Sequence, residues 1–372
     1  MNAPKLRFDE FSGEWVNKPI GKILTIGSGK DYKHLESGEI PVFGTGGLMT
    51  TVNSYLHDGE TVCIGRKGTI DKPMYFNGKF WTVDTLFYTH TFKDVLPKFI
   101  YNSFLCINWK EHNQASGVPS LSKSIIEKIH LNLPTLPEQI KIANFHNAID
   151  EKTNLLNRKV ELITQYKKSV MQKIFSQELR FKDDEGREFG AWEEKSLGEV
   201  TSLFSKRNKN LIDAPVYSVT NSHGFVLQSE QFEGPVAGSD LTNYKIISEN
   251  EFAYNPARIN VGSIALFRKK VGVISSLYVC FRCQSSLDNN FLLHFLELES
   301  TKQHINSFGE GGVRIYLWYP LFSQIPISLP SKPEQTKIAN FLTALDDQIS
   351  YAVAELDAVK QYKQGLLQQM FV

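Results

Sequence analysis

Three short motifs contain residue types that could do chemistry, and each lacks part of the pattern that the chemistry requires. Gly27-Ser28-Gly29-Lys30 resembles part of a phosphate loop, but Asp31 follows where G-x-x-x-x-G-K-[ST] needs Ser or Thr. Asn255-Pro256-Ala257-Arg258 lacks the second proline and the aromatic residue of an N-P-P-[aromatic] methyltransferase loop, so we interpret it as a turn. Cys280 and Cys283 form a lone C-x-x-C in a strand-like run, which is a poor zinc site.

The nine histidines are scattered and form no H-E-x-x-H or similar cluster. The sequence therefore predicts no catalytic residue, no metal site and no cofactor site in this chain. An enzyme that acts by itself is the weakest function class.

Composition sets the next bounds. A chain of 372 residues fits two to four domains, and 41% hydrophobic content is enough for buried cores. The net charge of +1 excludes a globally basic nucleic-acid binder but permits a locally basic surface. There is no apolar run near 18 residues, no apolar signal-peptide core at the N-terminus and no disulfide pattern among the four cysteines. We expect a cytoplasmic protein without a membrane span.

One element is written twice, 196 residues apart. LNLPTLPEQIKIANFHNAID begins at Leu131 and ISLPSKPEQTKIANFLTALD begins at Ile327, and the match runs without a gap to Phe175 and Phe371. Of these 45 positions, 17 are identical. The duplication predicts two copies of one structural unit and an approximate twofold axis.

The duplicated element has the pattern of a long helix in a coiled coil. An apolar residue recurs every seven positions, which gives the seam Ile142, Ile149, Leu156, Ile163, Val170 and its match Ile338, Leu345, Ala352, Val359, Leu366. We place a second seam at Phe145, Thr153, Val160, Tyr166, Ile174 and at Phe341, Ile349, Leu356, Tyr362, Met370. The alternative is two independent amphipathic helices, each on its own globular core.

Two β-rich segments separate these helices. Their landmarks correspond: Leu6-Arg7-Phe8 precedes Trp15 in one, and Leu179-Arg180-Phe181 precedes Trp192 in the other. We therefore predict an α+β fold with similar globular segments at 1–130 and 181–326 and long helices at 131–180 and 327–372. The chain ends in LLQQMFV and begins with a PKLRF that matches the segment after the first helix, so we expect a pseudo-cyclic arrangement.

The doubled PEQ-x-KIANF motif and the openings KLRF…GEW and LRF…GAWEEKSLGEV resemble the specificity subunit of type I restriction-modification enzymes over the whole chain. The resemblance implies two target recognition domains, each reading one half of a bipartite DNA sequence. It also implies an antiparallel coiled coil that spaces the halves and docks two methyltransferase subunits, with restriction subunits joining that core in some systems. S-adenosylmethionine is then expected on the methyltransferase partners, and ATP and Mg²⁺ on a restriction subunit.

Base reading in the major groove uses Arg or Lys for guanine and Asn or Gln for adenine, whereas phosphate contacts supply affinity. Both β-rich segments carry such side chains in Gly-rich, loop-like contexts. The predicted DNA contacts are Thr45, Arg66, Lys67, Gln114, Ser120, Lys206, Arg207, Asn208, Asn221, His223, Arg258, Asn260, Arg314 and Tyr316.

Two function classes remain. The first is a sequence-specific DNA-binding subunit of a methyltransferase or restriction complex. The second is a scaffold that binds no nucleic acid and carries two β-rich adhesion modules on a coiled-coil spacer. The doubled PEQ-x-KIANF motif favours the first.

Overall fold

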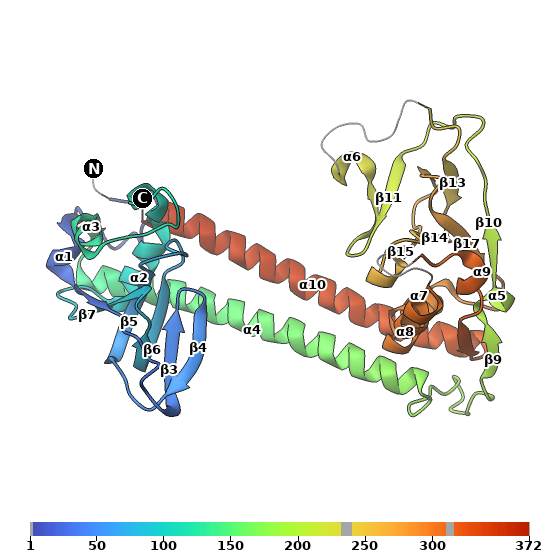
Figure 1. Cartoon of the computed structure of the whole chain (residues 1–372), viewed down its shortest axis with the longest axis horizontal. Coiled ribbons are helices and arrows are strands. Elements are labelled where there is room, and N and C mark those ends of the chain that lie inside the picture. Colours follow the sequence, from blue (N-terminus) through green and yellow to red (C-terminus); the bar gives the residue numbers. More distant parts are fainter. Residues whose placement is uncertain (1–2, 232–239, 310–315, 372) are drawn as a thin grey trace. The chain divides into compact units, whose positions relative to one another are not determined.

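The computed structural model describes residues 3–231, 240–309 and 316–371. It forms two compact units, one of residues 1–159 with 352–372 and one of residues 160–351. Both boundaries fall inside long helices, α4 (Leu136–Phe175) and α10 (Lys332–Met370), so each unit holds a β-rich segment and one end of each helix (Figure 1). The exact segment boundaries inferred from the sequence stay predictions.

The first unit contains one large sheet. Its elements are β1 (Val16–Pro19), α1 (Ile20–Ile23), β2 (Thr25–Ser28), β3 (Ser37–Gly44), β4 (Gly47–Val52), β5 (His57–Gly65), β6 (Met74–Thr82), β7 (Leu86–His90), α2 (Pro97–Cys106), the 3-10 turn η1 (Trp109–His112), α3 (Lys123–Lys128) and β8 (His130–Leu133). The sheet order is β2-β7-β5-β6-β3-β4, and β1 pairs separately with β8. The β3–β4 hairpin therefore lies at the sheet edge (Figure 1).

The second unit divides the corresponding strands between two sheets. Its elements are β9 (Glu193–Ser196), α5 (Leu197–Val200), β10 (Thr201–Phe204), β11 (Val216–Thr220), β12 (Gly224–Leu227), α6 (Gln228–Gln231), β13 (Lys245–Ser248), β14 (Glu251–Tyr254), the 3-10 turn η2 (Ile259–Val261), β15 (Ile264–Leu266), β16 (Val271–Ile274), β17 (Val279–Cys283), α7 (Asn289–Glu297), α8 (Glu299–Phe308), α9 (Tyr319–Phe322) and β18 (Pro326–Leu329). The sheet orders are β10-β17-β14-β15 and β12-β11-β16-β13, with β18 paired to β9.

Strand pairing shows that the two β-rich segments share one topology. Each has a hairpin whose first strand runs parallel to a later strand, Val42 opposite Trp81 in β3–β6 and Val216 opposite Val273 in β11–β16. The strand that is continuous as β5 in the first unit is interrupted between β13 and β14 in the second. Asn250, with φ of 67°, lies in that interruption.

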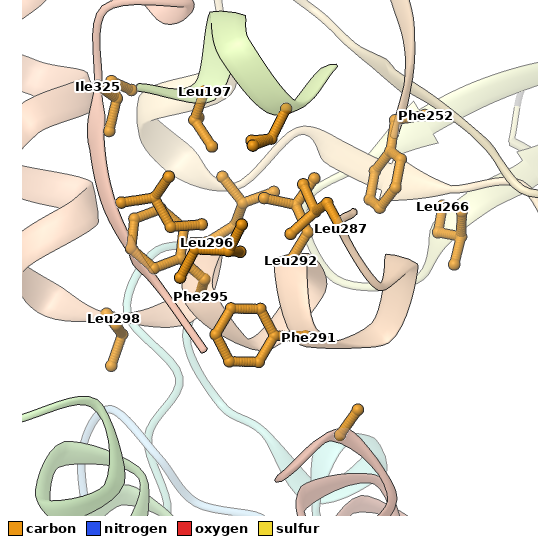
Figure 2. Packing of buried hydrophobic residues seen from close by; sticks show 14 of the residues in the cluster. Leu197, Phe252, Leu266, Leu287, Phe291, Leu292, Phe295, Leu296, Leu298 and Ile325 are labelled. Carbon is orange, nitrogen blue, oxygen red and sulfur yellow. The ribbon is translucent and has the colours of Figure 1, made fainter. Parts of the chain in front are cut away.

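A hydrophobic core holds each β-rich segment against its helix ends. In the second unit, Asp288 is the N-cap of α7, and its carboxylate accepts hydrogen bonds from Asn290 N and Phe291 N. Figure 2 shows Phe291, Leu292 and Phe295 of α7 in the same cluster as Leu197 of α5. The core includes Val170 and Ile174 from the end of α4 and Ile338, Leu342 and Leu345 from the start of α10. Each fully buried side chain of this size contributes roughly 1.5–3 kcal/mol.

The repeated PEQ motif fastens each helix start to the segment that precedes the β-rich fold. Glu138 is fully buried and accepts hydrogen bonds from Arg7 Nε and Nη2 at 2.6 and 2.8 Å and from Trp15 Nε1 at 3.3 Å. Glu334 does the same with Arg180, at 3.1 and 2.8 Å, and with Trp192 at 3.1 Å. In each unit, the repeated Arg, Trp and Glu landmarks of the sequence are therefore partners in a buried ion-pair network.

The neighbouring glutamine fixes the backbone around the same helix start. Gln139 Oε1 accepts from Leu96 N at 3.0 Å, and its Nε2 donates to Pro134 O at 3.0 Å. Gln335 repeats the arrangement with Asp288 N at 2.7 Å and Pro330 O at 2.8 Å. Because each amide satisfies a backbone donor and a backbone acceptor in the interior, neither glutamine is free to serve as a surface contact.

Contacts within the first unit join the two chain ends in the predicted circular manner. In the second unit, the chain leaving α4 returns as Leu179 N donates to Lys173 O at 3.0 Å. In the first unit, Leu6 N donates to Gln369 O at 3.1 Å. Gln369 is the equivalent of Lys173, 196 residues on, and Leu6 is the equivalent of Leu179, so the same contact here joins the two ends of the chain. The ring pair Phe8–Phe145 is likewise matched by Phe181–Phe341.

The first predicted seam is largely buried. Ile142, Ile149, Leu156, Val170, Ile338, Leu345, Ala352 and Leu366 are buried, and Ile163 and Val359 are half-buried. The start of α4 shares a core with the end of α10 in the first unit, and the end of α4 with the start of α10 in the second. The helices are therefore antiparallel.

The second seam was wrong at Tyr166 and Tyr362. Tyr166 and Tyr362 are 54% and 57% exposed, and the buried positions are Lys167 and, half-buried, Lys363. Phe145 and Phe341 pack against the aromatic rings described above, while His146 and Leu342 are fully buried. A shift of one residue along a helix turns the side-chain direction by about 100° around the helix axis, so both tyrosines face water.

Lysines are accommodated in this second seam because each meets an aspartate of the other helix. Lys363 pairs with Asp150 in the first unit, and Lys167 Nζ lies 2.6 Å from Asp346 Oδ1 in the second. The two pairs occupy equivalent positions of the duplicated helix, since both partners are shifted by 196 residues. Within the described residues, no helix combines the length and apolarity needed to cross a membrane.

Candidate nucleic-acid interface

A glycine turn and a neighbouring loop organise the polar residues of the first unit. Gly68 has φ of 89°, a conformation that favours glycine, and its N–H donates to Pro119 O at 2.8 Å. Next to it, Lys67 pairs with Ser120 in an isolated antiparallel bridge. Gln114 N in turn donates to Ser120 O at 3.1 Å, so these predicted contacts lie side by side.

The tip of the β3–β4 hairpin completes this arrangement. A Cβ atom at Gly68 would lie 3.9 Å from Thr45 Oγ1, which places the hairpin tip against the glycine turn. Arg66 is exposed, donates to Asp84 O at 3.3 Å and stands over the Phe87 ring at 5.8 Å. The structure thus brings together all five residues predicted for the first segment. We call Thr45, Arg66, Lys67, Gln114 and Ser120 the first loop cluster.

The second unit contains the same arrangement with different side chains. Gly262 has φ of 95°, and a Cβ atom there would lie 3.6 Å from the backbone oxygen of Asn221 at the β11–β12 hairpin tip. A third loop arrives as Leu317 N donates to Pro256 O at 2.9 Å. The turn that precedes Gly262 carries Arg258 and Asn260.

Most side chains of this second cluster face solvent. Asn221, His223, Arg258 and Tyr316 are exposed, and Asn260 is half-buried. His223 is held at the hairpin tip because its N–H donates to Thr220 Oγ1 at 3.0 Å and its Nδ1 lies 2.8 Å from Ser222 Oγ. We call Asn221, His223, Arg258, Asn260 and Tyr316 the second loop cluster.

Two predicted residues of the second segment belong to another part of the unit. Lys206 O accepts from Ile246 N at 2.7 Å, and Arg207 pairs with Lys245, so both lie beside β13. Both side chains are exposed. Among the described residues, neither forms a hydrogen bond, ion pair or strand pairing with the second loop cluster.

The prediction of Asn208 as a DNA contact is wrong. It is fully buried, and its Oδ1 accepts from Ile212 N at 2.9 Å, so it stabilises a turn and cannot reach a base. Asn favours loops both for turn hydrogen bonds and for base reading, and only burial separates the two. The prediction for Arg314 lies outside the described residues.

The three motifs with apparent chemistry have structural roles. Gly27 lies under the Tyr88 ring, where a Cβ atom would be 2.2 Å from the ring, and Gly29 abuts Val83 O. The next element is β3, so Lys30 does not stand before the helix that a phosphate loop requires. In the other motif, Asn255 Oδ1 accepts from Ala257 N at 3.0 Å, which makes the expected turn.

The cysteine pair lies on β17. Cys280 belongs to one hydrophobic cluster and Cys283 packs against another, so the strand sends them to opposite faces. Burial raises the pKa of each thiol to about 12, which disfavours the thiolate that zinc binds.

One group within the described residues could hold a metal ion by distance, namely His294, Glu297 and Asp346. Lys167 Nζ already lies 2.7 Å from Glu297 and 2.6 Å from Asp346. Its ammonium group takes the place between the carboxylates that a cation would need, so this cluster is an ion-pair network.

The sequence patterns missed the apolar residues near the first loop cluster. Leu48 and Met49 follow Thr45 on the hairpin and are 64% and 55% exposed, and Val118 is exposed in the third loop. A search for polar base-reading side chains passes over such residue types, which are most often buried. Their position beside Gly46-Gly47, at the tip of an edge hairpin, is the signal that could have identified Leu48 and Met49.

Comparison with known proteins places the chain in a class. The family model described as "Type I restriction modification DNA specificity domain" matches residues 12–165 and 190–361, one copy for each half. The chain belongs to this family. Its specificity subunits recognise DNA and are not catalytic, which confirms the predicted function class and disfavours the adhesion scaffold.

Individual relatives are distant in sequence. The chain is 23% identical over 338 residues to the type I restriction enzyme MjaVIII specificity subunit of Methanocaldococcus jannaschii, covering 84% of this chain and 76% of that one. Its fold is similar to the S subunit of a type I restriction-modification system from M. genitalium, with a TM-score of 0.69, 16% identity and coverage of 100% and 99%. A subunit from a study of assembly of the type I R-M system gives a TM-score of 0.54, 14% identity and coverage of 97% and 98%.

Proposed function

We propose that each unit reads one half of a bipartite DNA sequence through its loop cluster, and that the paired helices dock two methyltransferase subunits. The observation that carries this proposal is the repeated geometry of the clusters. In each unit, a hairpin tip, a glycine turn with positive φ and a third loop meet. The scaffold is common and the side chains differ, as two readers of unrelated half-sites require.

The chemistry of the clusters supports DNA as the ligand. The first presents Arg66, Lys67 and Gln114, and the second presents Asn221 and Arg258. Arginine and lysine can bind guanine or phosphate, and the amides can bind adenine. In such clusters, base contacts give the specificity, and the few cations that contact phosphates give an affinity that falls with salt.

The partners follow from the relatives rather than from a site in this chain. One similar structure comes from a study of a complex of the type I R-M system. We propose that methyltransferase subunits carry S-adenosylmethionine, and that restriction subunits, where the system has them, carry ATP and Mg²⁺. The purified chain alone should then transfer no methyl group to DNA.

A segment exchange tests the bipartite proposal. Residues 181–326 are replaced by the equivalent segment of a relative with a different specificity, in cells that also express the methyltransferase partners. Mapping methylated sites genome-wide should show one half of the recognised sequence changed and the other retained. The matched control exchanges residues 1–130, which should change the opposite half. An exchange that alters both halves would show that the units read DNA jointly.

Point substitutions test the clusters themselves. Arg66→Ala should weaken binding of duplex DNA and relax specificity in one half-site, whereas Arg258→Ala should act on the other half-site. A guanine contact is worth roughly 1–3 kcal/mol of discrimination. Arg187→Ala is the control, because Arg187 is exposed but pairs with Asp183 and Glu185 away from both clusters. Equal effects of all three would contradict the assignment.

A further inference from the structure

The edge hairpin of the first unit exposes apolar side chains that its own core does not use. Four consecutive residues of β4, from Leu48 to Thr51, are exposed. Met49 folds across the ribbon, since a Cβ atom at Gly44 would lie 2.6 Å from its Sδ. Apolar side chains on an open edge strand invite aggregation, so a protein that keeps them has a use for them.

These side chains adjoin the first loop cluster. Thr45, at the same hairpin tip, lies beside the glycine turn that follows Arg66 and Lys67. Val118, also exposed, precedes the Pro119 carbonyl that accepts from Gly68. Apolar groups and cationic groups therefore share one surface, which fits a partner that offers negative charge beside an apolar group.

Duplex DNA offers that combination in its major groove. The groove admits a two-stranded β-ribbon, and the apolar group it displays is the 5-methyl of thymine. We propose that Leu48 and Met49 contact thymine methyl groups in the half-site read by the first unit. This inference rests on the proposed function and names the base chemistry that the first reader uses.

The second unit supplies an internal contrast. At the positions that correspond to Leu48 and Met49, its hairpin carries Phe225 and Val226, which are half-buried, and Phe225 packs on the Phe267 ring. The exposed residues of the tip, Asn221, Ser222 and His223, are all polar. That tip is suited to hydrogen bonds with base edges rather than to a methyl group. Sensitivity to thymine methyl groups should consequently be concentrated in one half-site, the one that changes when residues 1–130 are exchanged.

The test removes single methyl groups from the DNA. Once methylome mapping gives the bipartite sequence, duplexes are made in which each thymine in turn is replaced by deoxyuridine. Binding of the complex with its methyltransferase partners is measured at fixed salt. Replacement at one or two positions of the first reader's half-site should weaken binding about fourfold per methyl group, the value expected for loss of one buried methyl. Replacements in the other half-site should have little effect.

Hairpin variants combined with the two duplexes complete a double-mutant cycle between protein and DNA. Leu48→Ala combined with Met49→Ala should weaken binding to the thymine duplex and have little further effect on the deoxyuridine duplex. His223→Ala, at the tip of the second hairpin, should weaken binding to both duplexes equally and leave the deoxyuridine effect intact. Circular dichroism and unchanged non-specific DNA binding show that the variants remain folded.

The proposal would be overturned if deoxyuridine were tolerated throughout, if the first half-site held no A·T pair, or if the hairpin variant lost equal affinity on both duplexes. Loss of assembly with the methyltransferase partners, with DNA reading intact, would assign the hairpin to a protein contact instead. Failure of the proposed function looks different, because the complex would then show no preference for any DNA sequence.

Discussion

At the scale of single residues, the buried glutamates of the duplicated motif determine whether each helix start is held in place. Glu138 and Glu334 each pair with an arginine and accept from a tryptophan indole in the interior. Breaking a buried pair by removing one partner is costly because the other charge is left uncompensated.

Glu138→Ala and Glu334→Ala should each destabilise their own unit by about 3–5 kcal/mol. Urea unfolding combined with hydrogen exchange would assign the loss to the first or the second unit. Glu14→Ala, at an exposed position near the same arginine, is the control and should change stability little. If either motif variant were as stable as the control, the network would not be the reason for the repeated motif.

His146 makes the first unit sensitive to acid. Burial, aided by the nearby Lys363 charge, lowers the pKa of His146 to about 4, and neither ring nitrogen has a hydrogen-bond partner among the described residues. The unfolded state therefore binds the proton more readily between pH of about 6.5 and 4. Stability of the first unit should fall as the pH is lowered through that window, by up to about 3 kcal/mol.

His146→Leu should remove this pH dependence, because the equivalent position of the other helix is the fully buried Leu342. The free energy of unfolding of the first unit is measured at pH 7 and pH 5 in both proteins. The half-buried His112 provides a control through His112→Leu, which should leave the acid sensitivity unchanged. A variant that remained as acid-sensitive as the parent would assign the effect to carboxylates.

At the scale of elements, the helix pairs combine apolar seams with two equivalent lysine–aspartate contacts. In the second unit, Lys167 is surrounded by Glu297 and Asp346, with His294 Nδ1 3.8 Å from Asp346. Burial by itself would lower the pKa of Lys167, but the two carboxylates outweigh it, so the pKa is raised and the ammonium persists.

Lys167→Met should destabilise the second unit by about 2 kcal/mol, since it leaves two facing carboxylates without a cation. The double variant Lys167→Met with Asp346→Leu should recover much of that loss, because an apolar pair suits a helix seam. Lys168→Met is the control on the neighbouring, exposed position. Additive losses in the double variant would show that the two side chains are not coupled.

At the scale of the whole molecule, each long helix contributes one end to the first unit and the other end to the second. The boundary between the units falls after Lys159 in α4 and after Tyr351 in α10. These positions lie away from the cores that hold the β-rich segments, so residues can be added there without cutting either core.

Inserting one heptad after Lys159 and one after Tyr351 should lengthen the unread gap of the DNA site by about three base pairs. Seven helical residues add roughly 10 Å, and a whole heptad keeps each seam facing its partner. Genome-wide mapping of methylated sites should return the same half-sites with a longer gap. Inserting four residues instead rotates the seam and should impair assembly, and an unchanged gap after the heptad would show that the helices do not set the spacing.

The sequence alone determined the features that depend on repetition and period. The duplicated PEQ-x-KIANF context, the seven-residue spacing from Ile142 to Val170 and the matching ends of the chain predicted the paired helices, the two β-rich units and the family. These signals persist because a helix repeats its geometry regularly and because the PEQ residues meet partners that are also repeated.

Tertiary structure decided what depends on burial and on contacts between distant segments. The sequence placed Tyr166 in a seam that Lys167 occupies, because a lysine is admitted there only through Glu297 and Asp346, which are 130 and 179 residues away. It treated Asn208 as a base contact, and burial reverses that prediction. Loop residues such as Thr45 and Ser120 become one cluster only when a hairpin, a glycine turn and a third loop meet, and no local pattern records that meeting.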